Sequence, residues 1–124
     1  MSDMAFSMSA EAANWIIDKL EAAENRAQFP GLIPGLYFFF DEQSRGENGR
    51  LVEWCREPFF DICWSRQEDV AAGNYVETQV HNRKLFSPPD TLERLNGKQL
   101  TLETVQVGFP TPSDKTRKIL RAMP

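Results

Sequence analysis

Four aromatic residues in a row, Tyr37 to Phe40, constrain the fold of this chain more than any other feature of its sequence. On a β-strand, neighbouring side chains point to opposite faces, so two of these rings lie on each face. A sheet that has one face in water keeps its large apolar side chains on the other face. We therefore expect both faces of this strand to be covered, the second one by more of the core, by a second copy of the chain or by a ligand.

The composition is that of one folded domain, which we expect to span residues 1–124 with flexible ends at 1–8 and 121–124. Apolar residues make up 41% of the chain, which is enough for a core. The net charge of −4 argues against binding to nucleic acid or to an anionic membrane, since both need a basic surface. The chain has no apolar run of ~18 residues and no basic signal-peptide start, so we expect a cytoplasmic protein.

Residues 9–28 have the pattern of an amphipathic helix, because apolar residues recur at alternating steps of three and four. Ser9 is a suitable N-cap, and Glu11 in the first turn suits the positive end of the helix dipole. The pattern stops before the prolines and glycines of residues 29–35, where we expect the helix to end.

The rest of the chain predicts the α+β class: a largely antiparallel sheet of about five strands, with the first helix packed across one face. The aromatic strand and residues 51–55 flank a glycine-containing loop and predict a β-hairpin, and residues 59–65 predict a third strand. A fourth strand is expected from Tyr75 to His81. The last is expected over residues 99–109, with a bulge or a strong twist near Glu103 or Thr104 where the apolar residues change phase.

Three further segments have helical patterns. A short helix is expected over residues 65–73, where Ser65 and Glu68 have the spacing of a capping box. A second is expected over residues 87–97, which have two prolines at their start and end in Asn-Gly. A C-terminal tail helix is expected after Ser113. The apolar side of this tail helix comprises Ile119, Leu120 and Met123.

The sequence contains no recognisable catalytic or metal-binding motif. Its one histidine, His81, is able to act as a general base for a thiol, but its spacing from Cys55 and Cys63 does not indicate that they meet. We expect a surface histidine and two buried, reduced and unreactive cysteines. Two thiols and one imidazole are too few for a closed zinc site. We therefore predict no catalytic residue, no metal and no cofactor.

The stretch SAEAANWIIDKLEA, followed by PGLYFFF and later by LNGKQLTLETVQVGF, resembles the outline of HesB-like domains, the scaffold of A-type iron–sulfur carriers. The resemblance covers about half of the chain and implies a similar helix that leads into a mostly β body. The cluster-binding cysteines of that family are expected in the regions that read DEQSRGENG and PTPSDKTRK, and neither contains a cysteine. Cys55 and Cys63 do not fit those positions, so the resemblance implies no ligand role here.

Two kinds of function follow from these observations. The first is a small, soluble, non-catalytic binding or assembly module, whose partner is another protein or a second copy of the chain in a homodimer. The second is a small-ligand-binding protein or enzyme with an aromatic-lined pocket. The resemblance adds a third reading, a HesB-like fold without cluster binding. The candidate ligand-binding residues are Tyr37, Phe39, Trp54, Trp64 and His81. The lack of a reactive set of residues favours the first kind.

Replacing Phe39 with alanine distinguishes a core position from a site position. If Phe39 belongs to the core, Phe39→Ala lowers the free energy of unfolding by about 3–5 kcal/mol. If the ring lines a ligand cavity, the loss is much smaller, because a ring that faces a cavity makes fewer contacts. Urea denaturation of both chains measures the difference.

Overall fold

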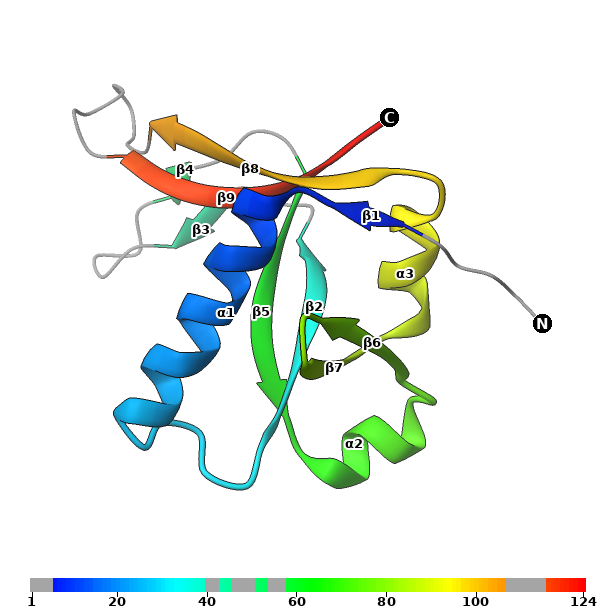
Figure 1. The fold of residues 1–124 in the computed structure, drawn as a ribbon. Coiled ribbons are helices and arrows are strands. Elements are labelled where there is room, and N and C mark those ends of the chain that lie inside the picture. Colours follow the sequence, from blue (N-terminus) through cyan, green and yellow to red (C-terminus); the bar gives the residue numbers. More distant parts are fainter. Residues whose placement is uncertain (1–5, 40–42, 46–50, 54–57, 107–115) are drawn as a thin grey trace.

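A curled, mixed five-stranded sheet carries the fold, in the order β1-β8-β9-β5-β2 (Figure 1). The computed structural model describes residues 6–39, 43–45, 51–53, 58–106 and 116–124. β1 pairs in parallel with β8, and the remaining pairs of the sheet are antiparallel. The strands of this sheet are β1 (Ser7–Met8), β2 (Ile33–Phe39), β5 (Phe59–Ser65), β8 (Gln99–Gln106) and β9 (Thr116–Met123).

Two small hairpins and three helices complete the described fold, which is α+β as expected. The hairpins are β3 (Gln43–Arg45) with β4 (Leu51–Glu53), and β6 (Val76–Val80) with β7 (Arg83–Ser87). The helices are α1 (Ala10–Asn25), α2 (Gln67–Ala72) and α3 (Pro89–Leu95). No helix in the described part of the chain is both long and apolar enough to cross a membrane.

The predicted N-terminal helix is confirmed as α1, including its cap. The Ala12 N–H donates a hydrogen bond to the Ser9 Oγ over 3.1 Å. The helix stops at Asn25, and the chain then takes positive φ angles of 52° at Ala27 and 56° at Phe29. One side of α1 enters the core, to which α3 and most of the strands also contribute. Its fully buried members include Ile16, Leu20, Leu36, Leu85, Leu92, Leu95, Leu100 and Leu120.

The aromatic strand β2 lies at one end of the strand order, although a strand with large rings on both faces is expected in the centre of a sheet. It pairs with β5, so the predicted hairpin with residues 51–55 is wrong for this strand; the 51–53 segment pairs with residues 43–45 instead. Local sequence patterns predict pairing between strands that follow each other along the chain. Here a pairing more distant in the chain, with the aromatic-rich β5, buries more apolar surface.

The second face of β2, on which Tyr37 and Phe39 lie, is covered only in part by the described residues. The ring of Tyr37 meets that of Tyr75 edge-on, with centroids 6.1 Å apart, and its hydroxyl is hydrogen-bonded to that of Ser65. Phe39 stacks on Phe59 with centroids 5.2 Å apart and is 36% exposed. This exposure favours the smaller of the two expected costs for Phe39→Ala. Phe40 lies outside the described residues.

Strand β7 packs directly against β2 at Gly35. A Cβ atom at Gly35 would lie 1.9 Å from the carbonyl oxygen of Phe86, so no side chain fits at this position. The neighbouring Leu36 N–H donates a hydrogen bond to the Oγ of the buried Ser87 over 2.9 Å. The backbone of β2 therefore lies directly against that of β7 at Gly35 and is anchored there by the Ser87 side chain.

The C-terminal segment forms strand β9, so the predicted tail helix is wrong. The neighbours Ile119 and Leu120 are 1% and 0% exposed, because both faces of β9 are covered. Adjacent buried residues of this kind are compatible with either a helix or a fully buried strand. The register between β8 and β9 runs unbroken from Gln99↔Met123 to Gln106↔Thr116, so the predicted bulge near Glu103 or Thr104 is also wrong. Ser113 lies outside the described residues.

Two smaller expectations are corrected. The expected fourth strand is β6, which ends at Val80. The chain turns at His81, where φ is +55°, and a further strand, β7, pairs with β6; this hairpin was not predicted. His-Asn lacks the glycine of the usual two-residue turns, so the hairpin signal was weak. The short helices α2 and α3 are confirmed, but no side chain caps either start, so the capping box of Ser65 with Glu68 is wrong.

The contact at Gly35 predicts a large effect of a single methyl group. Gly35→Ala should lower the free energy of unfolding by about 3 kcal/mol or more, because the fixed backbone of β7 cannot move away without breaking the core. The control is Gly31→Ala, where a Cβ meets nothing within 4 Å and the cost arises only from the φ of +75°. That cost is about 1 kcal/mol. Equal losses in urea denaturation would contradict this account of the β2–β7 contact.

Candidate functional site

A pocket of ≈ 500 Å³ lies between the C-terminal half of α1 and strand β5 and is open to solvent on one side. We call it the α1–β5 groove. The helix supplies one wall, the chain that follows it supplies the rim, and β5 supplies the other wall. The lining residues are Lys19, Ala22, Ala23, Arg26, Gln28, Phe29, Ile62, Cys63 and Trp64. Figure 1 shows β5 between α1 on one side and β2 on the other.

The wall formed by β5 is an open strand edge. Strand β9 pairs with β5 only at Phe60↔Leu120, and beyond that point no described strand lies on this side. In an antiparallel pair, the backbone N–H and C=O groups of successive residues point alternately toward and away from the partner strand. The Leu36 N–H bonds to Ser87, so its partner Ile62 forms a pair without mutual hydrogen bonds and directs its polar groups away from β2.

The environment of Ile62 agrees with this orientation. Its N–H donates to the Oδ1 of Asp61 over 2.8 Å, which satisfies the first donor on the open edge. Trp64 follows two residues later, and its backbone groups therefore point in the same direction. The groove consequently presents the carbonyl of Ile62 and both backbone groups of Trp64 to whatever enters it.

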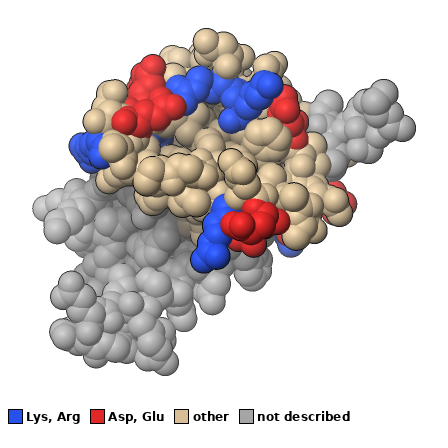
Figure 2. Space-filling view, turned by 90° about the horizontal axis from the view of Figure 1, so that it is seen from below, with Lys and Arg blue, Asp and Glu red and all other residues tan. Residues whose placement is uncertain are grey.

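Two stacked aromatic rings form the rim of the groove. The ring of Phe29 stacks on that of Trp64 with centroids 4.3 Å apart and planes 15° apart. The Phe29 side chain is 43% exposed. Its backbone φ of 56° lies in the left-handed region, which is uncommon for a bulky residue. Strained exposed residues are concentrated at functional sites. Figure 2, which views the end of the molecule where this turn and α2 lie, shows mostly uncharged residues across its centre.

The charge of the groove is positive. Lys19 and Arg26 line the helix wall, and none of the described lining residues is acidic. The Lys19 Nζ lies 2.6 Å from the Oδ1 of Asp61 and 4.6 Å from the centre of the Trp15 ring. Lys19 is therefore held against the strand wall by an ion pair, while Arg26 adds an exposed positive charge at the open side.

The thiol of Cys63 is directed into an environment that keeps it protonated. Burial raises the pKa of the Cys63 thiol above its ordinary value, the nearby Asp61 carboxylate raises it further, and Lys19 partly opposes this effect. A protonated thiol is a poor nucleophile. This environment agrees with the expected unreactive cysteine at this position.

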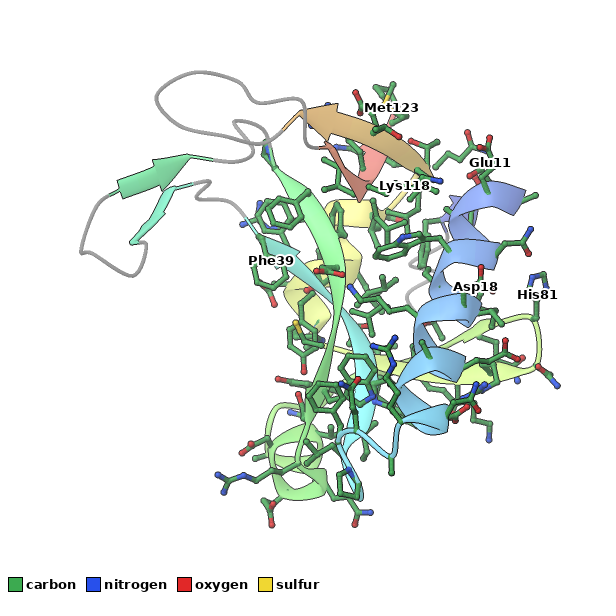
Figure 3. All side chains as sticks on the ribbon, turned by 90° about the vertical axis from the view of Figure 1, so that its left-hand side faces the viewer. Glu11, Asp18, Phe39, His81, Lys118 and Met123 are labelled. Carbon is green, nitrogen blue, oxygen red and sulfur yellow. The ribbon has the colours of Figure 1, made fainter. Side chains whose placement is uncertain are left out.

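The sequence-predicted site residues are not gathered in one place. Tyr37 and Trp64 project from opposite faces of the β2–β5 pair, because they occupy alternate positions of its register. Figure 3 shows Phe39 and His81 on opposite sides of the molecule. Trp54 lies outside the described residues, as does Cys55. Of the four candidates that the structure describes, only Trp64 lines the α1–β5 groove.

Sequence reasoning missed the three residues that shape the groove besides Trp64, namely Lys19, Arg26 and Phe29. Lys19 has the spacing of an ordinary solvent-facing helix residue, and Arg26 lies where the helical pattern ends. Phe29 gave the one available signal, since a large aromatic residue directly before Pro-Gly stands in a turn rather than in a core element.

No group of three potential metal ligands occurs among the residues that the structure describes. Comparison of the chain with protein-family models, with curated proteins and with solved structures finds no match. The resemblance to HesB-like domains therefore stays a prediction. Function has to be argued from the groove itself.

The environment of Cys63 predicts its reactivity. In a Cys55→Ser chain, iodoacetamide should alkylate Cys63 at pH 8 more slowly than it alkylates glutathione, because the raised pKa lowers the thiolate fraction. Asp61→Asn should increase the rate and Lys19→Met should decrease it, since the carboxylate raises the pKa and the ammonium group lowers it. The opposite order of the two variants would show that these charges do not control the thiol.

Proposed function

We propose that this chain is a non-catalytic protein-binding module that takes an extended segment of another protein into the α1–β5 groove. The segment adds to β5 as a further strand, with α1 along its other side. This mode of recognition uses main-chain hydrogen bonds for affinity and side-chain pockets for specificity. The observation that carries the proposal is the open edge of β5 at Ile62 and Trp64, which faces a pocket rather than another described strand.

The bound segment is expected to combine a carboxylate with a bulky apolar side chain. Arg26 offers a charged donor at the open side of the groove, and an acidic side chain or a C-terminal carboxylate complements it. The exposed Phe29 ring on Trp64 gives the apolar side chain an aromatic surface for contact. Aromatic and arginine side chains are the ones that most often dominate binding energies at interfaces.

A peptide suits the groove better than a second copy of the chain does. Helix α1 lines the groove opposite the edge of β5, so pairing of two such edges would bring the helices of both copies together as well. The Lys19–Asp61 ion pair also places charge beside Ile62, a common protection against edge-to-edge pairing. A single extended segment avoids both obstacles. The protonated Cys63 thiol and the remote His81 give no support to the alternative of an enzyme.

Selection from a displayed library of random peptides of about six residues tests the proposal, since such a length spans the groove wall. Peptides that bind the wild-type chain are labelled, and their dissociation constants are measured by fluorescence anisotropy. Phe29→Gly should weaken binding by about tenfold or more. Glycine takes the positive φ without strain, so the free energy of unfolding should stay within about 1 kcal/mol of wild type. Arg26→Gln should weaken binding about three- to tenfold.

Two controls separate strand addition from other modes of binding. Lys84→Gln removes an exposed charge on β7, away from the groove, and should leave the affinity unchanged. N-methylation of alternate peptide amides should weaken binding by about tenfold, because each lost hydrogen bond is worth about 1 kcal/mol or more. Equal binding of the methylated peptide, or hydrogen exchange at the Trp64 amide that the peptide does not slow, would contradict the proposal. A dimer whose Trp64 amide is already protected would assign the edge to self-association.

A further inference from the structure

A second pocket, of ≈ 380 Å³, lies where α3 and the turn after it face β2, β5 and β9. Phe38 and Phe60 form its apolar floor, with ring centroids 5.2 Å apart. Arg94, Lys98 and Arg121 stand around this floor. The pocket shares no lining residue with the α1–β5 groove, so it is a separate feature of the surface.

The cations of this pocket differ in how they are held. The Arg94 guanidinium lies over the face of the Phe38 ring, with its central carbon 4.1 Å from the ring centre. Arg121 is paired with Glu103, with 2.8 Å between nitrogen and oxygen. Arg94 and Lys98 are both exposed, and neither makes an ion pair with another residue of the described ranges. Two of the three cations are thus available to a ligand.

The local charge is opposite to that of the whole chain. The net charge of the protein is −4, yet three of the described lining residues of this pocket are basic and none is acidic. Surface charge that merely maintains solubility alternates in sign. A concentration of one sign inside a concave, partly apolar site raises the local concentration of ligands of opposite charge.

We propose that this pocket binds a small organic anion, in which a carboxylate or phosphate group is attached to a flat apolar group about the size of one ring. The Arg94 fork and Lys98 receive the oxyanion, because a guanidinium presents several N–H donors in one plane. The half-buried Phe38 ring, with the apolar surface of Pro58 and Ala122 beside it, holds the flat group. The volume is at the lower end of small-molecule sites, which fits one ring with its head group.

Phenyl phosphate, phenylacetate and the uncharged phenylacetamide are the probes that test this proposal. Each is titrated into the ¹⁵N-labelled chain, and backbone chemical shifts locate and quantify binding. The two anions should shift the amides of Phe38, Arg94 and Ala122, and phenylacetamide should bind at least about tenfold more weakly, because it lacks the charge. The stronger of the two anions identifies the head group. Inorganic phosphate should bind more weakly than phenyl phosphate, since it lacks the ring.

Variants separate this site from a purely structural contact between Arg94 and Phe38. Arg94→Gln should weaken binding of the stronger anion about tenfold and Lys98→Gln about threefold, while Lys84→Gln should not change it. Thermal unfolding shows whether each variant remains folded. The chemical-shift changes of the wild-type chain test the site even if a variant does not fold. No shift at these amides with either anion at 10 mM (about the weakest binding worth assigning to a site), or equal affinity for phenylacetate and phenylacetamide, would overturn the proposal.

Discussion

The contact between Gly35 of β2 and the backbone of β7 is the constraint on which the rest of this structure depends. At this point two backbones lie so close that even a methyl group has no room, and the Ser87 hydroxyl replaces the strand partner that Leu36 would otherwise need. A buried N–H without a partner costs on the order of 1–3 kcal/mol, so this one side chain stabilises the end of the sheet. At the β2 end of the five-stranded sheet, the next element is therefore the β6–β7 hairpin and not a sixth strand of that sheet.

The open edge of β5 lies on the side of that strand away from β2. Strand β2 pairs with one side of β5 along its whole length, whereas β9 leaves the other side after Phe60. From there on, the described part of β5 has one unpaired edge. Helix α1 lies along this edge, but the side chains of its last turns do not fill the space, and the α1–β5 groove results. An edge of this kind promotes aggregation unless charge or a covering element protects it. Here Asp61 and Lys19 protect Ile62, while Trp64 stays accessible through the groove.

The two pockets lie against neighbouring positions of one strand. Phe60 belongs to the floor of the pocket between α3 and the sheet, and Ile62 belongs to the wall of the α1–β5 groove. Both side chains lie on the core side of β5 and are 3% exposed. The two pockets therefore adjoin the same strand. Both combine aromatic surface with basic side chains on a chain of negative net charge.

The sequence by itself determined the local elements of this protein. The spacing of apolar residues located α1, its Ser9 cap and strand β5, because these features depend on a few neighbouring residues. It also predicted that both faces of the aromatic strand are covered, which holds only in part, since Phe39 on the second face is 36% exposed. Which groups cover β2 was decided only in the folded chain, since Tyr75 and strand β7 reach it from other parts of the sequence.

Only the tertiary structure decided the partners of the strands and the place of the candidate site. The tail residues Ile119 and Leu120 fit a helix or a fully buried strand equally well, and pairing with β8 selected the strand. The α1–β5 groove depends on where β9 leaves β5, which is a property of two distant segments and of no local pattern. Trp64 was therefore predictable as a candidate from its residue type. The roles of Lys19, Arg26 and Phe29 became visible only once α1 and β5 lay side by side.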